Sequence, residues 1–219
     1  MTPPRILKVG ILIGSTRVAR IGPQVAKFLL DILNNAGKKQ YNAAQSRTTI
    51  ETIDIQDFQL PMFNEPGLIN RITQTEDYFH EHTRTWSAHI ASFDAFIFLS
   101  AQRNWGIPAE LKNAIDYLFH EWKGKPVMIV SYGGHGGVQA AEQIKTVVGA
   151  IGMRVVERMV HMKFPNKEYL DRGLFGEDMG LDAETEGGTW AEYRDDIAEV
   201  FWNDMVGKML LDGDARVGL

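Results

Sequence analysis

The sequence predicts an α/β fold in which a five-stranded parallel sheet lies between two layers of helices. Nearly continuous apolar runs recur at residues 6–13, 93–99 and 127–130, which is typical of strands buried on both faces. The segments between these runs carry apolar residues at helical spacing and no hairpin signals. Each connection is therefore expected to be a right-handed crossover between parallel strands.

Strands and helices are expected to alternate through five repeats. The strands at 49–53 and 154–160 are weaker than the others, and the helix at 75–91 is mostly polar. Pro108 suits a first helical turn, while Gly124 and Pro126 end one helix before the next strand. Apolar stripes mark the other helices: Val25, Ala26, Leu29, Leu30 and Leu33, then Leu111, Ala114, Ile115, Leu118 and Phe119, then Ala140, Ala141, Ile144, Val147, Val148 and Ile151.

The C-terminal part differs in composition. Residues 166–189 carry seven acidic residues, two basic residues and five glycines, which predicts a long solvated loop and no fold element. We therefore expect one domain at 1–165 and a tail at 166–219, packed on that domain or on a neighbouring subunit. The tail should end in a helix that docks through Trp190, Tyr193, Ile197, Val200, Phe201, Met205 and Met209.

Composition excludes several classes of function. The 23 Lys and Arg against 28 Asp and Glu give a net charge of −5, which argues against binding nucleic acid or an anionic membrane surface. The chain has no cysteine, so redox chemistry would need a bound cofactor. No stretch approaches the roughly 18 apolar residues of a membrane span, and a cytoplasmic protein is expected.

In an open parallel sheet, ligands bind at the carboxyl ends of the strands where the strand order reverses, here between the first and third strands. Residues 14–23 follow the first strand and combine hydroxyl groups, Arg17, Arg20 and a helix N-terminus, which suits a single terminal phosphate. They match neither GxxxxGK[ST] nor GxGxxG. The alternative is a tight turn whose arginines face water.

Two further loops follow strands at the same edge. In residues 100–108, Trp105 or Arg103 would cover a planar heterocycle; alternatively, Trp105 fills a gap between helices and Asn104 closes a turn. Residues 131–137 contain four glycines, which allow the backbone to approach a ligand; the alternative is a flexible connector. Together the three loops describe a phosphate joined to a flat ring, as in flavin mononucleotide (FMN). No metal site is expected, because His80 and His82 lie two apart on a helix and no HExxH occurs.

The sequence resembles the NADPH-dependent FMN reductase family over residues 6–160. The resemblance is carried by GSTR after the first strand, LPMFNEP at 60–66 and NWGIPAELKNAIDYLFHEWKGKPVMIVSYGGHGG at 104–137, while HTRTWS at 82–87 is similar to the fungal branch. It implies a flavodoxin-like three-layer fold with strand order 2-1-3-4-5. The family includes FMN, quinone, azo and chromate reductases.

The resemblance also implies the reaction and the site. NADPH or NADH would reduce FMN, which would then reduce a quinone or similar acceptor in a ping-pong sequence. No side chain would be catalytic, with Arg103 and His135 as candidate substrate contacts. A homodimer or homotetramer would form through the helices near 108–121 and 138–151. The implied FMN contacts are Ser15, Arg17, Arg20, Ile21 and Gly22 at the phosphate, Ala101, Gln102, Arg103, Asn104 and Trp105 along the ring, and Ser131, Tyr132, Gly133, Gly134 and Gly136 on its far side.

One residue departs from the family pattern: Arg103 stands where tyrosine is common. Stacking on the flavin, attraction of a dinucleotide phosphate and closure of the substrate side are all open to an arginine there. Two other functions also remain open at the level of sequence. The chain could be an FMN-binding electron carrier without NAD(P)H turnover, or an interaction protein that kept the fold and lost the ligand.

Overall fold

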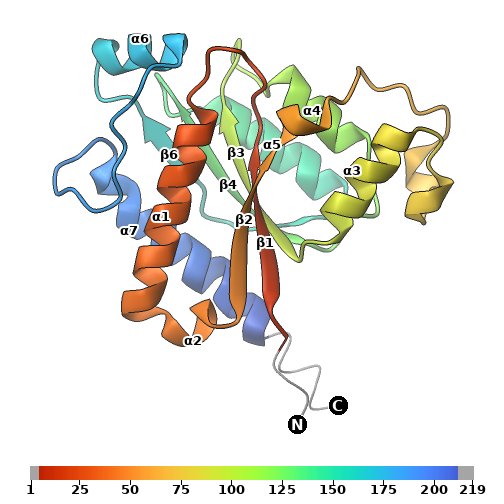
Figure 1. Ribbon diagram of the computed structural model, residues 1–219, viewed down its shortest axis with the longest axis horizontal. Helices are drawn as coiled ribbons and strands as arrows, with labels where there is room; N and C mark the ends of the chain where they lie inside the picture. Colours follow the sequence, from red (N-terminus) through yellow and green to blue (C-terminus); the bar gives the residue numbers. More distant parts are fainter. Residues whose placement is uncertain (1–4, 212–219) are drawn as a thin grey trace.

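The computed structural model describes residues 5–211 and contains one six-stranded parallel sheet (Figure 1). Five strands follow the order β2-β1-β3-β4-β5, and β6 pairs with β4, which confirms the predicted fold and strand order. The carboxyl ends of β1, β3 and β4 lie at one edge, since Ile13 pairs with Leu99 and Ser100 with Ser131. The strands are β1 Leu7–Ile13, β2 Thr48–Asp54, β3 Ala95–Ala101, β4 Pro126–Gly133, β5 Arg154–Val155 and β6 Val160–Lys163.

The last predicted strand, at 154–160, is divided in the structure. β5 and β6 each pair with β4, and residues 156–159 lie between them. Arg158 in this interval forms ion pairs with Glu199 at 3.1 Å and Asp204 at 3.5 Å, both in the C-terminal segment. A strand buried on both faces has no place for such a side chain, so the chain leaves the ladder there and resumes it two residues later.

Helices cover both faces of the sheet. α1 and the C-terminal segment lie on one face, and α3, α4 and α5 lie on the other (Figure 1). The predicted helix at 75–91 begins only at Glu81, after a 3₁₀ turn η3 at Thr75–Asp77, and the one near 108–121 ends at Asp116. The remaining bounds are α1 Gly22–Gln40, α2 Asn42–Gln45, α3 Glu81–Ala91, α4 Ala109–Asp116, α5 Val138–Ala150, α6 Lys167–Phe175 and α7 Arg194–Glu199, with short turns η1 Ile55–Phe58, η2 Ile69–Arg71 and η4 Ala191–Tyr193 and a π-helical segment η5 Val200–Gly207.

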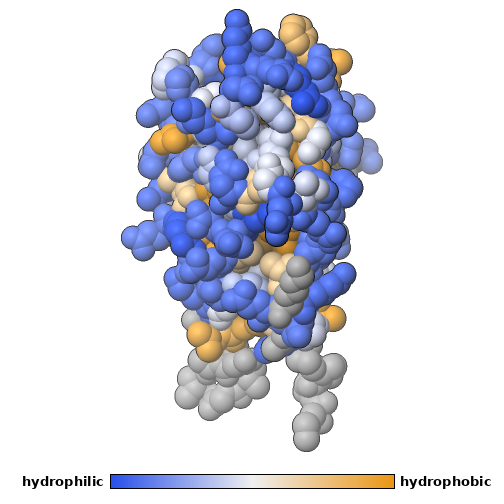
Figure 2. Space-filling model, turned by 90° about the vertical axis from the view of Figure 1, so that its left-hand side faces the viewer, coloured by the Kyte–Doolittle hydropathy of each residue, from blue (hydrophilic) through white to orange (hydrophobic). Residues whose placement is uncertain are grey.

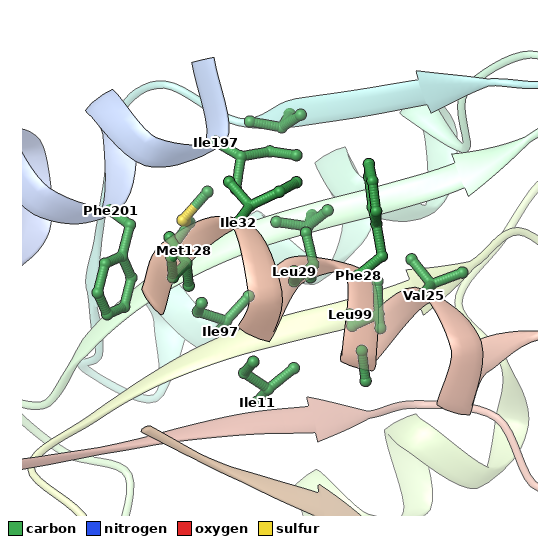
Figure 3. Packing of buried hydrophobic residues seen from close by; sticks show 14 of the residues in the cluster. Ile11, Val25, Phe28, Leu29, Ile32, Ile97, Leu99, Met128, Ile197 and Phe201 are labelled. Carbon is green, nitrogen blue, oxygen red and sulfur yellow. The ribbon is translucent and has the colours of Figure 1, made fainter. Parts of the chain in front are cut away.

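Successive residues of β1 serve opposite cores, because side chains alternate across a strand. Ile11 packs on the α1 face and Leu12 on the opposite face, and both are fully buried. Figure 3 shows the α1 face, where the helix stripe meets strand residues and the C-terminal segment adds Ile197 and Phe201. Burial of each large apolar side chain stabilises the fold by about 1.5–3 kcal/mol. The stripe consists of Val25, Phe28, Leu29 and Ile32, packed on Ile11, Ile97, Leu99 and Met128.

The prediction of a solvated loop at 166–189 is wrong for residues 167–175, which form α6. Asn166 caps the helix by accepting the Tyr169 N–H at 3.1 Å, and Gly176 ends it at φ 71°. The acidic, glycine-rich composition concealed a helix of only nine residues between these two caps.

Beyond α6 the tail packs on α1 of the same chain. Trp190, Phe201 and Trp202 are buried, and the Trp202 indole N–H donates to the Leu33 carbonyl at 3.2 Å. Figure 2 views this side, whose outer surface is largely hydrophilic. Within residues 5–211, no helix is long and apolar enough to span a bilayer.

Candidate functional site

A pocket of about 140 Å³ opens where β1, β3 and β4 end. All three predicted loops reach it, and α6 closes it from a direction that the sequence did not indicate. The predicted residues that line it are Ser15, Arg17, Arg20, Ile21, Ala101, Gln102, Arg103, Tyr132, Gly133 and Gly134, together with Ala19 of the predicted first loop. The unpredicted ones are Phe164, Leu170, Gly173 and Leu174.

Three arginines converge on the pocket. Arg20 forms two hydrogen bonds to Asp54, at 2.9 and 2.6 Å, and a third to the Ser15 carbonyl. Arg103 is 2.7 Å from the Glu110 carboxylate and donates to the Ser15 hydroxyl at 2.9 Å. Two of the three cations therefore have a carboxylate partner.

Arg17 is the exception. Its guanidinium donates to the carbonyls of Ala19 and Leu174, and it takes part in none of the ion pairs found among residues 5–211. The pocket wall thus carries one positive charge in excess, next to the N-terminus of α1. A helix N-terminus and an uncompensated guanidinium both favour an anion.

Glu110 is a site residue that the sequence did not reveal. It lies in the first turn of α4, and its carboxylate accepts the Thr16 N–H at 3.1 Å while it pairs with Arg103. Glu110 therefore accepts an N–H that the first loop would otherwise offer to an anion. Through Arg103 it also links the first loop to the second. In the sequence it cannot be told from the acidic residues that commonly begin helices.

Tyr132 forms the floor of the pocket. Burial raises the pKa of its hydroxyl to about 12, even though Arg103, Arg20 and Arg17 favour the anion. The hydroxyl therefore stays neutral at physiological pH and can donate a hydrogen bond. Gly22 lies behind it and does not line the pocket; a Cβ there would be 3.4 Å from the Tyr132 oxygen.

The second loop makes a tight turn between Arg103 and Gly106, which exchange two backbone hydrogen bonds of 3.1 and 2.8 Å. Asn104 and Trp105 occupy the turn at φ 47° and 63° and do not line the pocket. Trp105 is 62% exposed and stacks on His135 at 5.5 Å between ring centroids. The tips of the second and third loops therefore touch outside the pocket.

Gln102 connects the second loop to α5. Its side-chain oxygen accepts the N–H groups of Gln139 and Ala140, at 3.1 and 3.3 Å. These donors belong to the first turn of α5 and have no partner inside the helix. Gln102 therefore caps α5 and fixes the second loop to that helix.

Ser131 anchors the third loop through a hydrogen bond. Ser131 is fully buried; its hydroxyl donates to the Gly136 carbonyl at 2.7 Å and lies 2.8 Å from Nδ1 of His161. Burial lowers the pKa of His161. Ser131 and Gly136 do not line the pocket. Gly137 must be glycine, because its φ is 74° and a Cβ would lie 2.9 Å from that of Ser131.

The chemical character of these groups suits a flavin 5′-phosphate. The excess charge at Arg17 and the α1 N-terminus suits the phosphate, and Ala101, Gly133 and Gly134 are lining residues with small side chains or none, which leaves room for a flat ring. Ligand pockets typically measure about 300–1,000 Å³. The pocket is smaller than that because Leu170 and Leu174 of α6 close it.

The histidines and carboxylates in the described part of the chain form no metal-binding group. Among residues 5–211, no three His, Asp or Glu side chains are grouped so as to hold an ion. His80 and His82 stack on each other at 4.9 Å, and His82 contacts the Asn64 side chain at 3.2 Å.

Comparison with known proteins shows which family the chain resembles. The family model described as NADPH-dependent FMN reductase matches residues 7–166. An NAD(P)H-dependent FMN reductase from Schizosaccharomyces pombe is 41% identical over 167 residues, which cover 74% of this chain and 78% of the relative. A second, from Saccharomyces cerevisiae, is 36% identical over 152 residues, 68% of this chain and 78% of the relative.

Solved structures agree on the fold. A flavoenzyme NAD(P)H:(acceptor) oxidoreductase from Paracoccus denitrificans superposes with a TM-score of 0.59 at 19% identity, covering 93% of this chain and 98% of that one. An NAD(P)H:quinone oxidoreductase from Methanothermobacter marburgensis gives 0.56 at 15% identity, covering 90% and 98%.

Proposed function

Because the chain belongs to the NADPH-dependent FMN reductase family, we propose that it is an FMN-dependent NAD(P)H oxidoreductase whose flavin site is the pocket at the carboxyl ends of β1, β3 and β4. One observation carries the position of the site. Arg17, which has no carboxylate partner in the described part of the chain, stands beside the N-terminus of α1 at the wall where loops from three strands meet. That combination suits a terminal phosphate.

When bound, FMN accepts a hydride from NADPH or NADH and passes the electrons to an acceptor. The protein supplies binding and orientation. Arg17 and the α1 N-terminus hold the phosphate, the backbone at 101–103 and Gly133–Gly134 flanks the ring, and the neutral Tyr132 hydroxyl donates a hydrogen bond. Ser131, Gln102 and Gly136 position the loops. No ionised side chain has to act as acid or base in this scheme.

A quinone is the acceptor we propose. Quinone reductases from Pseudomonas putida are 28% identical to this chain over 149 residues, which is 64% of this chain and 69% of the relative. The acceptor and the nicotinamide would use the same face in turn, in ping-pong order, with Arg103 and His135 at its rim. Steady-state rates at several fixed NADPH concentrations would give parallel double-reciprocal lines.

The closed pocket also favours a second candidate, an FMN-binding electron carrier to which nicotinamide has no access. Both candidates predict a yellow protein. Only the reductase loses its visible flavin absorption when NADPH or NADH is added without oxygen. A colourless protein that takes up no FMN in calorimetry would exclude both.

We also propose a homodimer or homotetramer through α4 and α5. A hollow of about 850 Å³ runs between these helices, with Ile107, Lys112 and Val147 among its lining residues. Light scattering gives the assembly size, and Val147→Asp should dissociate it. The expected cytoplasmic location is likewise a proposal, tested by cell fractionation.

A further inference from the structure

α6 is the one wall of the pocket that lies beyond the segment matched by the family model, which ends at residue 166. Leu170, Gly173 and Leu174 line the pocket from this helix. Figure 1 shows α6 at the end of the molecule where β1 gives way to α1, beside the first loop. A ligand in the pocket would therefore lie under α6.

The helix is held at its ends, and its own residues are at most partly buried. None of its residues is buried, and Leu174 and Phe175 are 48% and 71% exposed. Before α6, Phe164 stacks on Trp190 at 5.5 Å. After it, the Gln24 side chain accepts the Met179 N–H at 2.9 Å. Segments with few buried contacts between fixed points open at low free-energy cost.

The C-terminal end of α6 closes onto the first loop. Arg17 donates to the carbonyl of Leu174, in the last turn, where carbonyls lack helical partners and the helix dipole is negative. Gly176 makes the approach possible: a Cβ there would lie 2.7 Å from the Arg20 nitrogen and 3.0 Å from the Ala19 carbonyl carbon.

We propose that α6 is a lid over the flavin site and that Arg17 is its latch, so that a ligand phosphate releases the lid by taking the guanidinium from the Leu174 carbonyl. The idea rests on the proposed function of the pocket. Exchange of a neutral carbonyl for a phosphate dianion favours release, since hydrogen bonds between charged groups are about twice as strong as neutral ones. FMN would therefore open its own lid, and riboflavin, which lacks the phosphate, would not.

Two glycines provide a matched pair for the test. Gly176 and Gly180 have φ 71° and 59°, so alanine is strained at both, but a Cβ at Gly180 has nothing within 4 Å. We would follow FMN and riboflavin binding to the flavin-free full-length protein by stopped-flow fluorescence. Gly176→Ala should accelerate riboflavin association on the order of tenfold, because strain at one residue of the closed lid raises the population of the open lid by about that factor. FMN association should be accelerated by less. Gly180→Ala should change neither rate more than about twofold.

Limited proteolysis provides a second readout, because trypsin can cut after Lys167 and Arg172 only when α6 is open. Inorganic phosphate should accelerate cutting of the wild type, compared with chloride at equal ionic strength, and Arg17→Ala should be cut rapidly with or without phosphate. If Gly176→Ala does not fold, Gln24→Ala, which removes the anchor at Met179, should give the same faster riboflavin association.

The lid is refuted if Gly176→Ala and Gln24→Ala bind both flavins at wild-type rates, or if phosphate does not alter cleavage of the wild type. FMN binding by the wild type would then still support the flavin site. If the wild type binds neither flavin in calorimetry, the proposed function fails and the lid fails with it.

Discussion

Replacement of Arg103 by alanine would leave the Glu110 carboxylate without its partner at the anion-binding wall. Arg103 reaches Glu110 at 2.7 Å and Ser15 at 2.9 Å, while Glu110 also accepts the Thr16 N–H. The three arginines and two carboxylates of the wall give an excess of one positive charge. Arg103→Ala removes that excess, Glu110→Gln raises it to two, and the double variant restores it to one.

The expected size follows from Coulomb's law. A unit charge about 6–8 Å from another, at an effective dielectric constant of about 20–40, contributes about 1–3 kcal/mol. Arg103→Ala should therefore raise the Kd for FMN by about 5- to 150-fold. Glu110→Gln should lower the Kd, and the double variant should return within about threefold of the wild type. The ion pair itself contributes no more than about 1 kcal/mol to stability, because the Arg103 side chain is 37% exposed.

Isothermal titration calorimetry on the four proteins gives the Kd values, and thermal unfolding shows whether each variant is folded. The same titrations at higher salt should shrink the differences, as screening requires. A double variant that binds FMN as weakly as Arg103→Ala would refute the charge-balance reasoning. It would show that Arg103 acts through direct contact with the ligand.

Three further results are expected. Arg17→Ala should raise the Kd for FMN about 10- to 150-fold through loss of a charge-assisted contact, whereas Arg71→Ala, an exposed arginine outside the pocket, should leave titrations unchanged. Gly137→Ala should lower the free energy of unfolding in urea by about 2–4 kcal/mol; Gly187→Ala, with φ 70° and open space, should cost only the backbone strain, and equal losses would contradict the close approach at Gly137. Burial lowers the pKa of His161, so the unfolded chain takes up protons that the folded protein rejects, and stability falls as pH drops below about 6.5. His161→Asn should reduce this loss between about pH 7.5 and about pH 5.5, without abolishing it, since the pKa of His89 is lowered as well; an unchanged loss would remove His161 as a source.

Much of the fold was predictable because its strands are buried on both faces. A short, continuous apolar run such as 93–99 fits a central strand of a parallel sheet better than any other element, and such runs fix where helices must cross over. The prediction of one last strand was wrong at Glu157 and Arg158, where the chain leaves the sheet. The sequence did not indicate this because the partners of Arg158 lie some forty residues away. α6 was not predicted for a similar reason. Its two caps, Asn166 and Gly176, are local signals, and its role depends on contact with the first loop, which is distant in sequence.

The site was predictable at the level of loops and less so at the level of side chains. Small residues and arginines after β1, β3 and β4 indicated where a pocket would form. The sequence could not show that the Gln102 side chain caps α5, or that Ser131 holds Gly136. Each depends on which way a side chain points at the end of a strand, and tertiary packing decides that. Nor could it show Glu110 within the anion-binding wall.

The packing of Phe201 and Trp202 on α1 bears on how the protein can be produced and divided. The match to the family model stops at residue 166, and a fragment cut there would look like a complete module in an alignment. It would nonetheless expose the outer flank of α1, an apolar strip that water would drive into aggregation. The end of the family-model match and the end of the segment that α1 needs for its burial therefore lie some forty residues apart in this polypeptide.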